Sequence, residues 1–483
     1  MRNSFFNGAG WLGGTLLNFI AMPFIVRKMG LDVFGVYALI TATMGYLSIL
    51  DLGIGQAIVK FVSEYQSQRL YEKVIETINN AVTFLLIMGF LGGAIIVLFS
   101  GSFSSFFNVP SAVAGDTQRA LVYTSIVFIL TIVIAGLSSV INGLQRFDIT
   151  SKLMLAYNSS LLVLTLIVLF MSGKLSHIML MNIFLLLLFT GLFFNRIYRI
   201  VPRYFFSIKL NIASLRPMTR FGSFLILSRI SSLVFTQFDK LFIGAILGTT
   251  AVGYYAVPSR VLNSLLAGVA SMGFAIMPRA SEISSPDNHE KQKDLYLRTS
   301  YYLILFITPV FLVLILLSKR FMTFWMGSEF AEHSWLLMSI IALSYYLSAS
   351  TNALWNVAIG MGLSKLQAVF SVILTIVSLA ALYPMTVKWG IQGTAVAVLS
   401  GSIVVPMTFY YMNKKVFHVQ QWLFVKKVLL IPFISSAIAT TVIVMIDHWF
   451  PMTFLSFVAL STVIIVIYAI SCRIAYKFAA INK

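Results

Sequence analysis

Four charged side chains interrupt long apolar runs in one part of the sequence and are the first candidates for chemistry. They are Arg229, Asp239, Lys240 and Arg260, and all lie between residues 220 and 282. A charge at the centre of a membrane helix costs about 2.5–3.5 kcal/mol on insertion scales, so such residues are rare without a use. Three bases and one acid in a single predicted helical hairpin indicate a cationic, hydrated cleft that binds an anion.

The spacing of these residues places them on facing parts of the hairpin. Arg229 and Lys240 are eleven residues apart in the predicted helix 221–247, which brings both side chains to nearly the same helix face. Arg260, in the predicted helix 252–277, lies at a depth similar to that of Asp239, so these two form a candidate ion pair. The structural alternative is that Asp239 neutralises one base while the other bases reach the membrane surface along their flexible stems.

The equivalent hairpin in the first half of the chain carries a single acid near its inner end. This acid, Asp51, is a candidate partner for Arg229 across the cleft or for a coupling cation. The competing interpretation ties its carboxylate to a helix end or to Lys60. Lys60 and Glu64 are four residues apart, which permits a helical ion pair at the predicted cytoplasmic end. We treat this pair as a candidate gate.

The composition predicts an integral membrane protein. Hydrophobic residues make up 59% of the chain and charged residues 10%, whereas a soluble domain has about 25% charged residues. The net charge of +19 follows from the positive-inside rule and gives no support to nucleic-acid binding. The single cysteine, Cys472, excludes a disulfide within the chain. The first apolar run has no small-residue cleavage pattern, so we expect the first helix to remain in the mature protein.

The hydropathy pattern predicts an all-α fold of about fourteen membrane-spanning helices. With the N-terminus in the cytoplasm, 24 Lys and Arg fall on the cytoplasmic side, seven outside and three within the membrane, which accounts for all 34. This asymmetry predicts that both termini are cytoplasmic. The predicted spans are residues 5–26, 33–57, 79–100, 119–141, 153–171, 175–195, 221–247, 252–277, 300–318, 333–358, 366–386, 390–412, 428–446 and 453–472.

An internal repeat of 218 residues organises these spans. Six spans separate equivalent positions, so both halves insert the same way up and are related by a pseudo-twofold axis along the membrane normal. In this register Gly30, Gly35, Tyr37, Ala38, Gly55 and Ser63-Glu64 fall on Gly248, Gly253, Tyr255, Ala256, Gly273 and Ser281-Glu282. The predicted domains are an N-lobe (1–200), a basic cytoplasmic linker (201–220), a C-lobe (221–412) and a C-terminal helix pair (413–483).

Several enzyme signatures are missing from the sequence. There is no GxxxxGK[ST] phosphate-binding loop, no HExxH and no cluster of metal ligands, so we expect no cofactor and no metal. The five histidines fall in loops or at the ends of spans. A membrane acyltransferase or a glycan polymerase would need catalytic polar residues within the membrane or a sizeable external loop. The sequence therefore favours a transporter over an enzyme.

Two sequence segments and the arrangement of spans resemble a known family. The twelve-plus-two spans, the six-span repeat, the segment LDLGIGQAIVKFVSEY and the GxxxxGYY segment resemble the polysaccharide transporters of the MOP superfamily, and within it the Wzx-type flippases of O-antigen and related bacterial glycans. The resemblance covers nearly the whole chain. It implies two six-helix lobes around a central cleft that opens alternately to each side of the bacterial cytoplasmic (inner) membrane.

The resemblance also implies a substrate. Family members pass an undecaprenyl-pyrophosphate-linked oligosaccharide repeat unit to the outer leaflet, and a diphosphate would suit the bases Arg229, Lys240 and Arg260. Coupling to H⁺ or Na⁺ and contact with the glycan polymerase machinery are compatible with the family. The alternatives are a lipid II flippase, a cation-coupled multidrug exporter, which would favour acids in its cleft, a membrane glycan polymerase or ligase, and a non-transporting scaffold.

Overall fold

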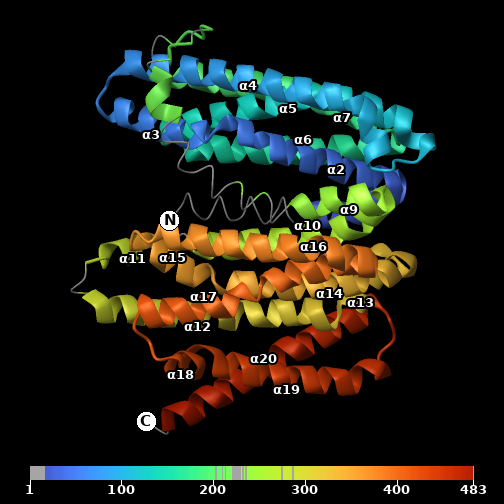
Figure 1. The fold of residues 1–483 in the computed structure, drawn as a ribbon, viewed down its shortest axis with the longest axis vertical. Helices are drawn as coiled ribbons and strands as arrows, with labels where there is room; N and C mark the ends of the chain where they lie inside the picture. Colours follow the sequence, from blue (N-terminus) through green and yellow to red (C-terminus); the bar gives the residue numbers. More distant parts are fainter. Residues whose placement is uncertain are drawn as a thin grey trace. The chain divides into compact units, whose positions relative to one another are not determined.

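The chain is helical throughout the part that the structure describes. The computed structural model describes residues 17–201, 204–208, 210–212, 214–219, 230, 233, 237–273, 276–285 and 288–481, the last seven by backbone only, and these residues form helices and connections without a strand. They fall into two compact units, Met1–Gly253 and Tyr254–Lys483 (Figure 1). The prediction of an all-α membrane protein is confirmed, whereas the boundaries of the four predicted domains stay predictions.

The first unit is built around three long helices. Helix α4 packs on α5, α5 packs on α7, and α3 lies against both α4 and α5. Small residues permit the α4–α5 contact, because a Cβ at Gly89 would lie 3.2 Å from the Cα of Ile129. After the helical residues 17–29, the elements are α2 (Leu31–Leu47), η1 (Ser48–Asp51), α3 (Ile54–Ser67), α4 (Tyr71–Phe106), α5 (Ser111–Gly143), α6 (Phe147–Met171), α7 (Leu175–Ile200), α9 (Asp239–Leu247) and the first residues of α10 (Thr249–Gly273).

The second unit repeats this plan and adds two helices. Helix α12 packs on α14, α14 packs on α16, and α11 lies against α15. The elements that follow α10 are α11 (Ile276–Glu282), α12 (His289–Leu316), α13 (Ser318–Met326), α14 (Ser328–Ser350), α15 (Asn352–Gly360), α16 (Ser364–Gly401), α17 (Val404–Lys415), α18 (Gln421–Phe424), η4 (Val425–Leu429), α19 (Leu430–Ile446), η5 (Asp447–Trp449) and α20 (Phe454–Ile481).

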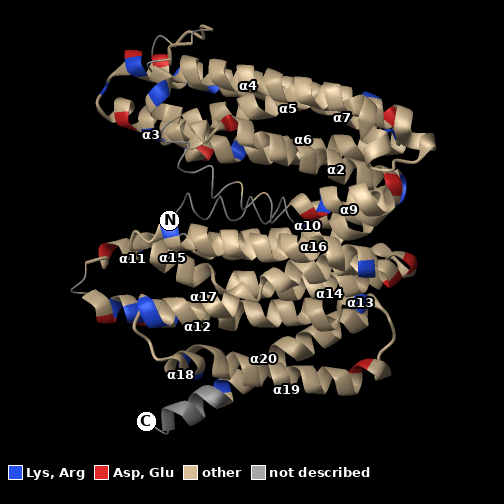
Figure 2. Cartoon of the chain, in the orientation of Figure 1, with Lys and Arg blue, Asp and Glu red and all other residues tan. Residues whose placement is uncertain are grey.

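The helices of the described chain agree with the predicted membrane spans. Ten are long and apolar enough to cross a membrane, and one of these, 364–415, combines two predicted spans. Its break lies at Gly390, whose φ of 58° and ψ of −140° suit glycine. Of the remaining three predicted spans, 5–26 and 221–247 extend into residues outside the described ranges, and 333–358 corresponds to α14 and α15. Figure 2 shows that charged residues gather mostly near helix ends.

The C-terminal helix pair is packed onto its own unit. Helices α19 and α20 contact each other, and both contact α12. Their shared apolar core places side chains from all three helices together, so the pair forms part of the second unit instead of a separate appendage. The buried residues of this core are Val313, Leu317, Ala439, Ile443, Leu460 and Ile464.

Candidate functional site

Two of the predicted site residues form a buried charged pair at the start of α9. Asp239 is 6% exposed and Lys240 is 8% exposed, although the helix that they begin, DKLFIGAIL, is otherwise apolar. The backbone N–H of Lys240 donates to Oδ1 of Asp239 at 2.8 Å, and its Nζ donates to Oε1 of Gln237 at 3.0 Å. The first unit therefore holds an ammonium and a carboxylate side by side in apolar surroundings.

Glycines bring α2 close to this pair. A Cβ at Gly244 of α9 would lie 2.7 Å from Cδ2 of Leu39, and a Cβ at Gly45 of α2 would lie 3.6 Å from Cγ of Gln237. Next to Gly45, the hydroxyl of Tyr46 is buried and has no hydrogen-bond partner within the described part of the chain. A cluster of polar groups, an amide, a hydroxyl and two charged side chains, thus lies where α2 meets α9.

The two other bases predicted for the cleft are not brought to this pair by the described structure. Arg229 lies outside the described residues. Arg260 is an exposed residue of α10 in the second unit, whereas Asp239 belongs to the first unit. The expected Asp239–Arg260 ion pair would join the two units and stays a prediction.

Asp51 lies near the end of the second predicted span, and Lys60 and Glu64 follow it on α3. Asp51 ends η1, and its Oδ1 accepts the backbone N–H of Gly53 at 2.9 Å. That bond supports the turn between η1 and α3. Lys60 and Glu64 are both exposed on α3, and Nζ of Lys60 lies 4.6 Å from the centroid of the Phe61 ring. Cation coupling by Asp51 and pairing of Lys60 with Glu64 stay predictions.

The two repeats meet at the first turns of α2 and α10, and the contact is reciprocal. A Cβ at Gly35 would overlap the carbonyl oxygen of Thr249, and a Cβ at Gly253 would lie 2.8 Å from the carbonyl oxygen of Leu31. In the 218-residue register Gly35 corresponds to Gly253 and Leu31 to Thr249. All four residues belong to the first unit. Each contact is thus the symmetry mate of the other, and the pseudo-twofold axis passes between them.

A polar contact lies on the same axis. Oδ1 of Asp32 accepts the hydroxyl of Thr249 at 3.3 Å and forms a shorter hydrogen bond with the hydroxyl of Thr250. Asp32 and Thr250 are themselves equivalent positions of the two repeats. The glycines Gly30 and Gly248, which precede α2 and α10, both have a positive φ, 76° and 82°, so the two helices begin alike. The topology predicts that this contact between the first turns of α2 and α10 faces outside.

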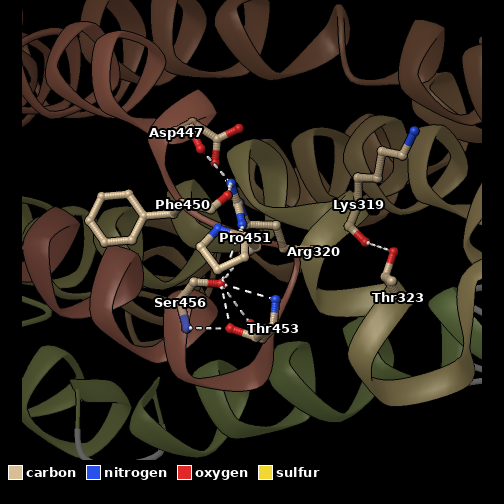
Figure 3. Close-up of polar contacts among 8 residues, drawn as sticks. All are labelled: Lys319, Arg320, Thr323, Asp447, Phe450, Pro451, Thr453 and Ser456. Atoms are coloured by element: carbon tan, nitrogen blue, oxygen red, sulfur yellow. Dashed lines mark hydrogen bonds and ion pairs between the residues drawn. The ribbon is translucent and has the colours of Figure 1, made fainter.

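Arg320 is one of the seven bases predicted for the outer side and was not a candidate site residue, yet all three of its guanidinium nitrogens donate hydrogen bonds. Arg320 in α13 is 4% exposed and donates to the connection between α19 and α20 (Figure 3). Its Nε donates to Oδ1 of Asp447 at 2.6 Å, and Nη1 donates to the Pro451 carbonyl at 2.6 Å and to Oγ of Ser456 at 3.3 Å. Nη2 donates to the carbonyls of Asp447 and Phe450. One arginine therefore fixes this loop.

A signal for the Arg320 contact is present in the sequence. Arg320 and Asp447 carry opposite charges at the ends of apolar spans, and both fall on the predicted outer side, which has few charges. On such a side an acid and a base at span ends are natural partners.

Among the described residues, no group of three or more His, Cys, Asp or Glu side chains is placed to hold a metal ion.

Comparison with known sequences identifies a protein family and two relatives. Residues 1–284 match the family model for "Polysaccharide biosynthesis protein". The chain is 23% identical over 405 residues to the "Putative O-antigen transporter" of Shigella flexneri, covering 82% of this chain and 93% of that protein. It is 26% identical over 283 residues to "Uncharacterized membrane protein EpsK" of Bacillus subtilis (strain 168), covering 56% of this chain and 55% of that protein.

Comparison with solved structures establishes the fold. The inward closed lipid II flippase MurJ superposes with a TM-score of 0.71 at 14% identity, over 93% of this chain and 97% of that chain. An inward-facing multidrug resistance MATE family transporter of the MOP superfamily gives 0.73 at 13% identity, over 84% and 98%. The predicted resemblance is confirmed. The chain belongs to the polysaccharide biosynthesis protein family and has the fold of MOP superfamily transporters.

Proposed function

We propose that this protein is a flippase that moves an undecaprenyl-pyrophosphate-linked oligosaccharide repeat unit across the bacterial cytoplasmic membrane by alternating access. The observation that carries the proposal is the buried ammonium of Lys240, held inside an otherwise apolar helix against α2. A buried charge in a membrane helix is costly and marks substrate or ion pathways. Membership of a polysaccharide biosynthesis family gives that charge a fitting ligand, the diphosphate that joins the lipid to the sugar.

The balance of charges favours an anionic cargo over a cationic one. The helical hairpin around Lys240 contains three bases and one acid, Asp239, within its apolar runs. A diphosphate would accept charge-assisted hydrogen bonds from Lys240, and from Arg229 and Arg260 if these also reach the cleft. An exporter of cationic drugs would need the opposite excess. The name of the Shigella flexneri relative supports a surface glycan as the cargo.

The contact between α2 and α10 supports alternating access. Gly35 and Gly253 bring the two repeats into backbone contact, and the bond between Asp32 and Thr250 ties them together. A transporter with one closed end must separate these helices in order to open that end. Lys240 lies on α9, the helix that precedes this contact, so movement of α10 away from α2 would change the surroundings of Lys240.

The test is complementation of a strain that lacks the gene. A double variant, Arg229→Gln with Lys240→Met, is compared with the unchanged chain and with Lys388→Met, which removes an exposed base near Trp389. We expect the double variant to insert normally, to lose long surface glycan and to leave lipid-linked repeat units in the cytoplasmic leaflet, while Lys388→Met behaves as the unchanged chain.

Three outcomes would contradict the proposal. Full surface glycan in the double variant would show that these bases do not bind the cargo. Normal glycan in the deletion strain, together with altered sensitivity to cationic drugs, would assign the chain to drug export. Restoration of growth in a strain depleted of its lipid II flippase, without any effect on surface glycan, would replace the proposed cargo with lipid II.

A further inference from the structure

The segment that joins the two repeats exposes large apolar side chains. Phe205 is 78% exposed, Ile208 75% and Ile212 74%. The segment begins directly after α7, a candidate membrane span that ends at Ile200. Exposed apolar residues within a span face lipid and need no explanation, but these three lie beyond the end of one. We refer to Phe205, Ile208 and Ile212 as the linker apolar surface.

Hydrogen bonds hold this segment against α4. Glu76, Asn79 and Asn80 are spaced i, i+3 and i+4, so their side chains share one face of the helix. Nδ2 of Asn79 donates to the Phe205 carbonyl at 3.1 Å, and Oδ1 of Asn80 accepts the Asn211 N–H at 2.6 Å. Oε1 of Glu76 accepts Nδ2 of Asn211 at 3.1 Å. The position of the linker is therefore set by specific side chains.

These bonds give the linker two different faces. Tyr204 is 3% exposed, Leu215 6% and Met218 2%, so they form the face that is buried in the first unit. The linker apolar surface points away from that face. Three apolar side chains of the linker are therefore packed in the first unit. The exposure of the other three is not explained by poor packing of the whole segment. An ordered segment that presents an apolar face outward is typical of an interfacial membrane contact.

The linker's own charged residues have one sign, and Glu76 of α4, which bonds Asn211, is the acid that lies against it. From Asn195 to Arg220 the chain contains six Lys and Arg and no Asp or Glu. Arg196, Arg199 and Arg216 are exposed, while Arg203, Lys209 and Arg220 lie outside the described residues. Clusters of bases next to a membrane span are attracted to anionic lipid headgroups, and the exposed apolar side chains enter the layer beneath them.

We propose that the linker apolar surface, together with Arg199 and Arg216, docks into the headgroup layer of the leaflet where α7 ends and binds anionic lipids there. Two observations favour a bilayer over a protein partner. The surface is continuous with the end of a membrane span, and its charge complements an anionic leaflet. The predicted topology places it on the cytoplasmic side. The contact is independent of the cargo that the protein carries.

The experiment measures the depth of a spin label in the full-length purified protein. The label is placed by Ile208→Cys in a Cys472→Ser background, which removes the single native cysteine. The matched control is Gln68→Cys, an exposed position between α3 and α4 that is also predicted to be cytoplasmic. Each protein is placed in nanodiscs of phosphatidylcholine alone or mixed equally with phosphatidylglycerol, and collisions with oxygen and with a water-soluble nickel chelate are compared.

We expect the label at Ile208 to collide several-fold less with the nickel chelate than the label at Gln68 when phosphatidylglycerol is present. Adding Arg199→Gln and Arg216→Gln should return the Ile208 label toward the value at Gln68. Equal nickel access at both positions in both lipid mixtures would overturn the proposal and leave a protein as the occupant. Nickel protection that needs neither phosphatidylglycerol nor the two arginines would overturn the anionic-lipid part.

Discussion

Two buried bases, Arg320 and Lys240, are almost equally shielded but differ in where their partners lie. Arg320 is 4% exposed and Lys240 8%. The acceptors of Arg320 are 127 to 136 residues away in sequence, in the connection between α19 and α20. Gln237, which accepts from Nζ of Lys240, is three residues earlier in the chain. Burial alone therefore does not identify a binding site. The contacts of Arg320 cross-link distant parts of the chain, whereas Gln237 is a local contact and is one of several that Lys240 makes.

The chemistry of the two side chains agrees with this difference. A guanidinium is planar and presents five N–H donors in a fixed arrangement, which suits the set of carbonyl and carboxylate acceptors around Arg320. An ammonium is a compact charge on a flexible stem and can change partners at little cost in geometry. We infer that Arg320 serves the stability of the second unit and that Lys240 serves the transport cycle.

The largest effect is expected for Arg320→Met. This change removes the donors from the Asp447 carboxylate and from three backbone carbonyls while the loop stays in place. Leaving an acceptor without its hydrogen-bond donor costs about 1–3 kcal/mol, and several acceptors lose theirs together, so the midpoint of thermal unfolding in detergent should fall sharply. An unchanged midpoint of thermal unfolding would contradict the structural role of Arg320. Arg320 would then contribute as little to folding stability as we expect Lys240 to contribute.

Lys240→Met should separate transport from stability. Loss of a hydrogen bond to a charged group costs about 1.5–3 kcal/mol, which corresponds to roughly ten- to hundredfold weaker binding of a lipid-linked diphosphate. Because Lys240→Met alone leaves the buried Asp239 carboxylate without its neighbouring base, stability is compared in Asp239→Asn with Lys240→Met, whose unfolding midpoint should stay near that of the unchanged protein since both buried charges are removed together. The checks are binding of a lipid diphosphate and thermal unfolding, measured for both variants. Lower stability with intact binding would reverse the assignment.

Asp447→Asn should have a smaller effect than Arg320→Met. The amide keeps an oxygen for Nε of Arg320, and the backbone acceptors of the loop remain. The Asp447 side chain is also 40% exposed, so water can compensate in part. We expect a loss of about 1 kcal/mol, the typical difference between a charged and a neutral hydrogen bond. Thermal unfolding that falls as far as in Arg320→Met would show that the carboxylate alone, and not the carbonyls, holds the loop.

The smallest effect is expected for Lys319→Ala, which serves as the matched control for Arg320. Nζ of Lys319 lies 2.9 Å from Oε1 of Glu332, but the two side chains are 44% and 61% exposed. Exposed ion pairs contribute about 0–1 kcal/mol, so the unfolding midpoint should barely move, and it should move even less at high salt. A large salt-sensitive loss would mean that this end of α13 is held by surface charge and not by Arg320.

Hydropathy and the repeat were sufficient to predict the helical fold. The break at Gly390 falls between the predicted spans 366–386 and 390–412, and Gly30 and Gly248 precede equivalent helices, as the register requires. These features are local, since each depends on residues near it in the sequence. The predicted repeat also placed Gly35 on Gly253, but sequence alone could not show that the two glycines face the partner repeat across the axis.

The contacts of the charged residues were harder to predict. The sequence places Arg320 and Asp447 at span ends on the same predicted side, but it does not show that they meet, because the contact forms only after α19 and α20 pack on α12. The linker was recognised as basic, but the residues that hold it, such as Asn80, belong to α4. Lys240 was predicted to belong to a cationic, hydrated cleft. Its side chain is 8% exposed, and its role in binding cargo stays a prediction.

The bond between Asp32 and Thr250 joins the same position of the two repeats. In a dimer of two identical half-length chains, a contact on the symmetry axis joins a residue to its own copy. Two aspartates there would repel each other, and two threonines would lack the charged acceptor that strengthens the bond. Duplication within one gene allows the two copies of this position to diverge. The Asp32–Thr250 bond can thus form only between halves whose sequences have diverged. A homodimeric ancestor, with the same residue at both positions, could not form it.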